Sequence, residues 1–210
     1  MAGFFITFEG IDSCGKSLQA RKLARKLEAN RVPVLLIRDP GTTPISENIR
    51  AILLSVRNQG MCFETELLLF AAARAQMMHE TILPALNAGK IVLCDRFYDS
   101  TTAYQGYGRS LDLGIINILN QFASHERAPD LTFLFDITIE TANKRHEASR
   151  REKDRMETVD LDFIKRVRNG FLKIAQAHPH RVQVIDGERS IDVIAEEVWQ
   201  SIESKIKSFV

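Results

Sequence analysis

Short apolar runs alternate with longer amphipathic segments along most of the chain. The short runs are mostly apolar throughout, which is typical of strands that are buried on both faces of a sheet. The longer segments repeat their apolar residues at the spacing of one helix face. The predicted strands cover residues 4–8, 34–37, 91–94, 131–135 and 182–185.

The alternation of strands and helices predicts an α/β fold, with a parallel sheet and helices on both of its faces. Ligands of such sheets bind at the carboxyl ends of the strands. No internal repeat or linker interrupts the pattern, so we expect one domain over residues 1–210. The predicted helices cover about residues 17–30, 44–56, 64–88, 112–124, 138–148, 160–177 and 190–208.

A phosphate-binding motif lies between the first predicted strand and the first predicted helix. Residues 10–17 read Gly-Ile-Asp-Ser-Cys-Gly-Lys-Ser, a G-x-x-x-x-G-K-S pattern in the context that confirms a P-loop. Its backbone N–H groups and the following helix N-terminus form an anion cradle. We expect Lys16 to reach the β- and γ-phosphates and Ser17 to ligate Mg²⁺. The residues predicted to bind ATP are Gly10, Ile11, Asp12, Ser13, Cys14, Gly15, Lys16 and Ser17.

The third predicted strand ends in an acidic residue that is followed by an arginine, Asp95 and Arg96. An acid at a strand end after an apolar run is what a Walker-B position requires, and it orients Mg²⁺ directly or through water. The planar guanidinium of Arg96 suits a second phosphate, because it binds phosphate oxygens in a bidentate manner. An ordinary Asp–Arg ion pair is the alternative reading.

Other polar positions are ambiguous when each is taken alone. Asp39 follows the second strand but fits an ordinary strand-to-helix turn, and Arg50 fits a solvated surface charge. Phe70 and Arg74 share a helix face, yet their spacing alone favours a core residue beside a rim charge. Residues 98–109 are rich in hydroxyls and amides, which suits either a base-reading segment or a polar loop.

Composition narrows the class of protein. The chain has 210 residues, is 45% hydrophobic and carries a net charge of +1, so no basic field points to nucleic acid or an anionic membrane as a partner. Its three cysteines show no metal-ligand spacing and fit reduced thiols. No apolar run is long enough to span a bilayer. We expect a soluble cytoplasmic enzyme.

Together these segments resemble the bacterial type of thymidylate kinase, over nearly the whole chain. The resemblance rests on FEGIDSCGKS, RDPGTTPISENIR, LLLFAAARAQ, CDRFYDSTTAYQGYGR and APDLTFLFDI, in that order. It implies a three-layer P-loop fold whose five-stranded parallel sheet has the order 2-3-1-4-5, with a short lid at about residues 146–157 and a homodimeric assembly. It also implies transfer of the γ-phosphoryl group of ATP to dTMP, with Mg²⁺ as cofactor, in dTTP biosynthesis.

The resemblance also implies roles for single residues. Phe70 would stack on thymine, Arg74 would bond its exocyclic oxygen, and Arg50 and Arg96 would hold the acceptor phosphate. Tyr104 would crowd the sugar 2′ position, and Asp12 would lie near the 3′-hydroxyl. The predicted substrate-binding residues are Asp39, Arg50, Phe70, Arg74, Arg96, Ser100, Thr101, Tyr104 and Gln105; the predicted catalytic residues are Asp12, Lys16, Arg96, Arg150 and Arg155; the predicted metal ligands are Ser17 and Asp95.

The chain departs from the family pattern at two places. The family usually has Glu at the position of Asp39 and Gly at the position of Thr42. The family lid usually reads Arg-Gly-x-x-Asp-Arg, whereas residues 150–155 read Arg-Arg-Glu-Lys-Asp-Arg and lack the glycine. Because Cys14 stands where some members carry a P-loop arginine, the catalytic cation is expected to come from the lid, either from Arg150 or from Arg155.

Three other functions are alternatives. A kinase for another nucleotide or nucleoside would share the scaffold. A switch GTPase would need a guanine-reading Asn-Lys-x-Asp, and the nearest match, residues 143–146, lacks the acid. A P-loop protein that acts on nucleic acid is disfavoured by the near-neutral net charge of +1.

Overall fold

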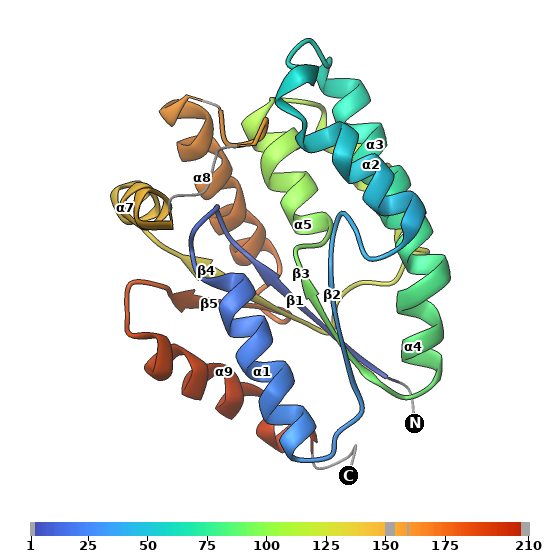
Figure 1. Ribbon diagram of the computed structural model, residues 1–210, viewed down its shortest axis with the longest axis vertical. Coiled ribbons are helices and arrows are strands. Elements are labelled where there is room, and N and C mark those ends of the chain that lie inside the picture. Colours follow the sequence, from blue (N-terminus) through green and yellow to red (C-terminus); the bar gives the residue numbers. More distant parts are fainter. Residues whose placement is uncertain (1–2, 150–153, 159, 207–210) are drawn as a thin grey trace.

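A five-stranded parallel sheet of order β2-β3-β1-β4-β5 forms the centre of the computed structural model (Figure 1). The structure describes residues 3–149, 154–158 and 160–206. The order and the parallel pairing confirm the predicted fold class. The strands are β1 (Phe4–Glu9), β2 (Val34–Arg38), β3 (Ile91–Asp95), β4 (Leu131–Asp136) and β5 (Val182–Asp186).

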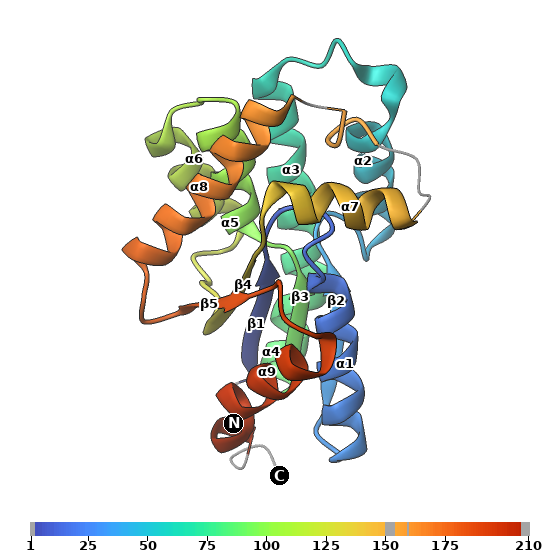
Figure 2. The same cartoon turned by 90° about the vertical axis from the view of Figure 1, so that its left-hand side faces the viewer.

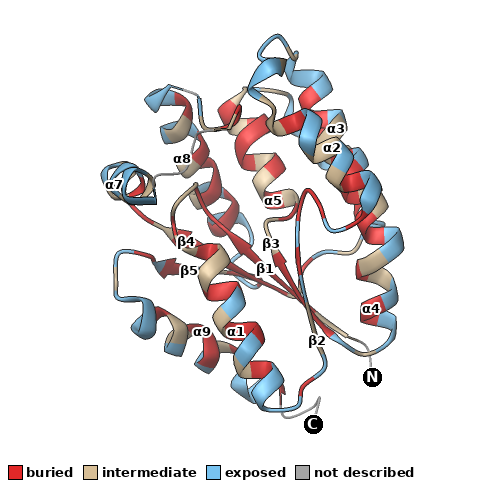
Figure 3. Ribbon diagram, in the orientation of Figure 1, coloured by how far each residue is buried: buried red, intermediate tan, exposed pale blue. Residues whose placement is uncertain are grey.

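Helices cover both faces of this sheet (Figures 1 and 2). Side chains of β1 alternate between the two faces, as the pleat requires: Phe5 joins the apolar cluster of α3 and α4, and Ile6 joins the cluster of α1 and α9. The three central strands β3, β1 and β4 are therefore mostly buried, while the outer helix faces are exposed (Figure 3). The helices are α1 (Lys16–Ala29), α2 (Pro44–Leu54), α3 (Phe63–Met77), α4 (Leu83–Asn87), α5 (Tyr98–Thr101), α6 (Leu113–Ala123), α7 (Ile139–Ser149), α8 (Leu161–Ala177) and α9 (Ile191–Ile206).

Two π-helical segments depart from the predicted pattern. The helix predicted over 64–88 is divided, because π-helical turns over Met78–Ile82 separate α3 from α4. A second π-helical segment, Thr102–Gly108, continues α5, and its wider winding shows in the bond from the Arg109 N–H to the Tyr104 carbonyl at 2.9 Å. Such insertions are common at functional sites. Here the segment carries two predicted substrate-binding residues, Tyr104 and Gln105.

Local sequence signals explain where the helices near the sheet edge begin. Thr43 caps α2, accepting a hydrogen bond from the Ser46 N–H at 3.2 Å, and Pro44 occupies the first helical position. The carboxyl ends of the strands therefore open into short loops, where ligands of parallel sheets bind. None of the helices that the structure describes is long and apolar enough to cross a membrane.

Candidate active site

The loop between β1 and α1 has the backbone geometry of an anion cradle. Gly10, Ser13 and Gly15 all have positive φ, at 137°, 62° and 98°. A Cβ on Gly10 would lie 2.5 Å from the Phe135 carbonyl oxygen, so only glycine fits there. A Cβ on Gly15 would meet no atom within 4 Å, so that position faces open space. This open space is large enough for an added methyl group, and it agrees with the predicted phosphate cradle.

The predicted cationic and metal-binding residues lie around this loop. The Lys16 side chain is buried; its Nζ donates to the Ile11 carbonyl at 3.3 Å and lies 3.8 Å from Asp12 Oδ1. Ser17 lies in the first turn of α1, and Asp95 ends the neighbouring strand β3, in register with Phe8 of β1. A hydroxyl and a carboxylate at adjacent sheet ends suit Mg²⁺, which takes most of its oxygen ligands from water and phosphates. Among the described residues, no group of three or more His, Cys, Asp or Glu side chains is placed to hold a metal.

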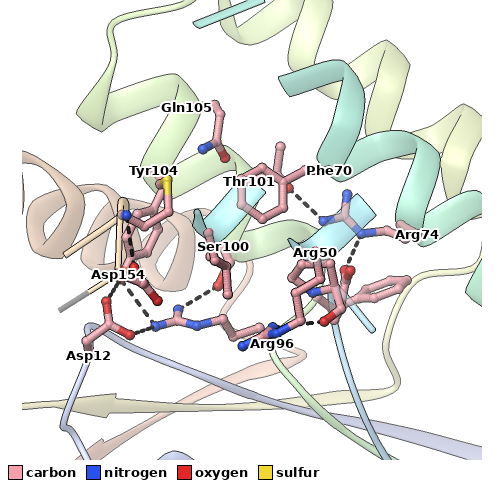
Figure 4. A pocket seen from close by; sticks show the side chains of 15 residues that line it. Asp12, Arg50, Phe70, Arg74, Arg96, Ser100, Thr101, Tyr104, Gln105 and Asp154 are labelled. Atoms are coloured by element: carbon pink, nitrogen blue, oxygen red, sulfur yellow. Dashed lines mark hydrogen bonds and ion pairs between the residues drawn. The ribbon is translucent and has the colours of Figure 1, made fainter. Parts of the chain in front are cut away.

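Arg96 connects the P-loop to the neighbouring pocket. Its backbone is left-handed, with φ at 69°. Its Nη2 donates to Asp12 Oδ1 at 2.6 Å and its Nη1 donates to Ser100 Oγ at 2.9 Å (Figure 4). The same Nη1 donates to the Gly10 carbonyl at 3.0 Å. Burial raises the pKa of Asp12, but the Arg96 and Lys16 cations lower it by more, so it lies well below its usual value. Asp12 therefore stays ionised and holds Arg96.

A buried carboxylate beneath Arg96 was missed by the sequence reasoning. Glu9 accepts hydrogen bonds from the Phe97 N–H at 2.7 Å and from Ser100 Oγ at 2.5 Å. It thereby fixes the turn after β3 that carries Arg96. Burial, together with the nearby Asp99 carboxylate, raises the pKa of Glu9 to about 8. The only sequence signal for this position is an acid at the end of an otherwise apolar strand.

One pocket brings together all of the residues predicted for the acceptor. It lies between the P-loop, α2, α3 and the α5 segment, as Figure 4 shows. Asp12 of the P-loop lines it as well. Sequence reasoning did not predict Pro40, Leu54, Phe97, Asp154 and Met156. The predicted residues that line the pocket are Asp39, Arg50, Phe70, Arg74, Arg96, Ser100, Thr101, Tyr104 and Gln105.

Arg74 is held by several buried partners at one end of this pocket. Its Nε donates to Asp39 Oδ2 at 2.6 Å, its Nη2 to Thr101 Oγ1 at 2.7 Å and its Nη1 to Asn120 Oδ1 at 3.1 Å. Burial raises the pKa of Asp39, and the paired Arg74 limits the rise. Asp39 Oδ1 is buried without a hydrogen-bond partner, so a polar atom of the pocket wall remains for a ligand. Although the Asp39 side chain is one methylene shorter than the glutamate usual in the family, it reaches Arg74.

Two further cations, Arg50 and Arg96, line the same pocket. Arg50 is half-buried and donates its Nη1 to the Pro40 carbonyl at 2.9 Å. Burial lowers the pKa of Arg50, and the like charges of Arg38 and Arg96 lower it further. An anion between Arg50 and Arg96 would relieve this repulsion, which is the chemistry that a phosphate site requires.

The lid differs from the prediction. Arg155, predicted to supply a catalytic cation, is buried: its Nη1 lies 2.6 Å from Glu66 Oε2 and its Nε donates to the Leu53 carbonyl at 2.6 Å. In this arrangement Arg155 contacts Glu66 and the Leu53 carbonyl and does not line the acceptor pocket. Arg150 lies outside the described residues. Arg145 of α7 instead reaches the P-loop, at the Cys14 carbonyl (3.4 Å), and the Gly187 carbonyl (2.9 Å).

Comparison with known proteins agrees with this geometry. The family model described as thymidylate kinase matches residues 8–198. The chain belongs to the thymidylate kinase family. It is 48% identical to a thymidylate kinase of Geobacter sulfurreducens, over 92% of this chain and 93% of that relative. It is also 48% identical to one of Kosmotoga olearia, over 92% of both chains. A crystal structure of thymidylate kinase from Ehrlichia chaffeensis matches with a TM-score of 0.78 and 37% identity, over 96% of this chain and 99% of that one.

The departure from the thymidylate kinase pattern at Thr42 has a structural explanation. Thr42 stands where the family usually has glycine, and its φ is 76°, a conformation that costs a β-branched residue about 1–3 kcal/mol. Its N–H donates to Glu47 Oε1 at 2.7 Å, and its hydroxyl donates to the Arg38 carbonyl at 3.1 Å. These bonds offset the strain, so the turn forms without glycine.

The two glycines of the P-loop should respond differently to the same added methyl group. We expect Gly10→Ala to lower the free energy of unfolding, by about 3 kcal/mol or more, because the methyl group meets backbone. Gly15→Ala should cost only about 1–3 kcal/mol of backbone strain but abolish ATP binding, since the methyl group enters the open cradle. Urea unfolding and calorimetric titration with ATP and Mg²⁺ measure the two effects. ATP affinity unchanged in Gly15→Ala would contradict the assigned cradle.

Proposed function

We propose that this chain transfers the γ-phosphoryl group of ATP to the 5′-phosphate of dTMP, giving ADP and dTDP for dTTP synthesis. The observation that carries this proposal is the contact of Arg96 with Asp12, at 2.6 Å, which joins a P-loop to a pocket for a second ligand. A P-loop alone binds only the nucleotide that donates the phosphoryl group. A pocket with paired cations at one end and an aromatic ring at the other suits an acceptor that carries its own phosphate.

The residues of the pocket divide between the parts of the acceptor. Phe70 stacks on the base, Arg74 donates to its exocyclic oxygen, and Ser100, Thr101 and Gln105 complete the base site. Arg50 and Arg96 bind the acceptor phosphate. Tyr104 donates to Asp12 Oδ2 at 3.0 Å, so these two side chains form one wall, which we assign to the sugar.

Catalysis requires positioning and charge neutralisation rather than proton abstraction. The second pKa of a phosphate monoester is about 6. The attacking oxygen of the acceptor phosphate is therefore largely ionised at neutral pH and needs no general base. Lys16 neutralises charge on the donor phosphates, and Arg96 holds the acceptor oxygen against their repulsion. Ser17 and Asp95 would hold Mg²⁺, which when bound neutralises charge on the phosphates. The lid cation is assigned to Arg150, because Arg155 is enclosed against Glu66.

A panel of acceptors tests this function. We expect ADP release from ATP and Mg²⁺ to be fastest with dTMP, weaker with dUMP, and slow with dCMP, dGMP, dAMP and thymidine. Thymidine lacks the phosphate that Arg50 and Arg96 bind. Cytosine and adenine carry an amino group where thymine presents an exocyclic oxygen to the donor at Arg74, and guanine is a larger base with two rings. A coupled assay of ADP under identical conditions compares the values of kcat/KM. A preference for thymidine over dTMP, or for a purine nucleotide, would refute the assignment.

We further propose that the enzyme acts in the cytoplasm as a homodimer, without nucleic acid or membrane partners. The α6 helix lies on the outside of the molecule (Figure 2) and has no charged residue from Leu113 to Ala123. Ile115, Ile118 and Phe122 form one exposed apolar stripe on it, with exposures of 57%, 65% and 80%. An uncharged apolar stripe does not repel a second copy of itself, and burial in a symmetric interface removes it from water.

Substitution within this stripe should separate the two copies. We expect Ile118→Lys to convert the protein from dimer to monomer in sedimentation velocity, because it places like charges opposite each other in the interface. Asn117→Lys adds the same charge on another exposed face of α6 and should leave the dimer intact. A monomeric wild-type protein, or equal behaviour of the two variants, would contradict the proposed interface.

A further inference from the structure

Glu66 is a buried carboxylate to which sequence reasoning assigned no role. It lies in α3 with 0% exposure and accepts from three side chains of other elements. Gln105 Nε2 donates to its Oε1 at 2.8 Å, and Arg155 Nη1 lies 2.6 Å from its Oε2. Arg109 bridges both oxygens, at 3.2 and 3.3 Å. The two guanidinium groups compensate its charge, which makes a buried carboxylate tolerable here.

The contact with Glu66 fixes which way the Gln105 amide faces. A side-chain amide has one donating and one accepting end, whereas an ionised carboxylate can only accept. Only the Nε2 end of Gln105 can therefore face Glu66, and a flipped amide would place two oxygens against each other. Gln105 also lines the acceptor pocket (Figure 4), and because one N–H of its Nε2 is bonded to Glu66, its single acceptor atom, Oε1, is turned away from that carboxylate.

An accepting oxygen at this position discriminates between pyrimidines. Thymine and uracil carry a hydrogen at N3 and donate there, whereas the N3 of cytosine is an acceptor. A fixed Oε1 binds the first two and repels the third, and a site built around such a hydrogen bond rejects the wrong partner strongly. The selectivity between thymine and cytosine then depends on Glu66, which prevents the Gln105 amide from turning.

Glu66 also holds the part of the pocket wall that the lid contributes. Arg155 is anchored by Glu66 and by the Leu53 carbonyl, and its backbone N–H donates to the Leu54 carbonyl at 3.1 Å. Its chain neighbours Asp154 and Met156 both line the pocket. Glu66 is therefore bonded at one oxygen to the base site and at the other to the lid.

We propose that Glu66 is a positioning residue for base selectivity, which orients the Gln105 amide toward the acceptor base and fixes the lid through Arg155. This inference rests on the proposed kinase function. It adds to that function a residue that is not expected to touch the substrate and that decides between dTMP and dCMP.

The test is a comparison of Glu66→Gln with wild type, using dTMP, dUMP and dCMP as acceptors. A glutamine at 66 can present either end of its amide, so Gln105 becomes free to turn. We expect the ratio of kcat/KM for dTMP to that for dCMP to fall by about tenfold or more. The ratio for dTMP to dUMP should stay the same, because both bases donate at N3. Glu64→Gln, the same change at an exposed position of α3, should alter neither ratio.

A second background separates orientation of Gln105 from a general structural effect. In Gln105→Ala the selectivity should already be lost, and adding Glu66→Gln should change the ratio no further. An equal loss from Glu66→Gln in both backgrounds would overturn the proposal. If Glu66→Gln does not fold, Glu66→Asp keeps the charge for the arginines but withdraws the carboxylate from Gln105, and it should lower the same ratio. A wild-type ratio retained in the folded variants would also overturn it.

The two proposals fail in different ways. If wild-type protein does not prefer dTMP, the proposed function is wrong. If wild-type protein prefers dTMP and the Glu66 variants keep that preference, only the role of Glu66 is wrong.

Discussion

The guanidinium of Arg96 joins the two halves of the site, because its donors reach the P-loop at Asp12 (2.6 Å) and the pocket at Ser100 (2.9 Å). A planar fork held at several points has little freedom to move, so donor and acceptor sites keep a fixed separation. The buried Glu9 supports this arrangement from below, through Ser100 and the backbone after β3. In-line transfer between two phosphates depends on such fixed positions more than on proton transfer.

Two pairs of buried charges with matched partners support the wall of the pocket. Arg74 is paired with Asp39 at 2.6 Å, and Glu66 is paired with Arg155 at 2.6 Å. Such pairs add little net stability, because desolvation cancels much of their attraction. Removing one partner, however, leaves an uncompensated charge in the interior. The pairs therefore specify one arrangement of α3, the lid, and α5 with its π-helical continuation. That arrangement shapes the space in which a base fits.

The sequence sufficed for features that local patterns encode. The P-loop, the strands and the Thr43 cap follow from residue types and spacing, and the acceptor residues followed from a resemblance that covers several motifs. The roles of Glu9 and Glu66 could not be predicted, because a buried acid acquires its role from partners that are distant in the chain. The π-helical segment that carries Gln105 has no distinct sequence signature. The burial of Arg155 could not be predicted, because an arginine-rich stretch does not reveal which of its cations faces inward.

The most direct measurement compares the binding of dTMP and thymidine, by calorimetric titration, to wild type and to Arg96→Gln. If Arg96 holds the acceptor phosphate, the variant should lose about 10–100-fold in affinity for dTMP, as expected for a charge-assisted contact. Its affinity for thymidine, which has no phosphate, should change by no more than about twofold. Equal losses for both ligands would mean that Arg96 shapes the pocket without binding the phosphate, and would contradict the account.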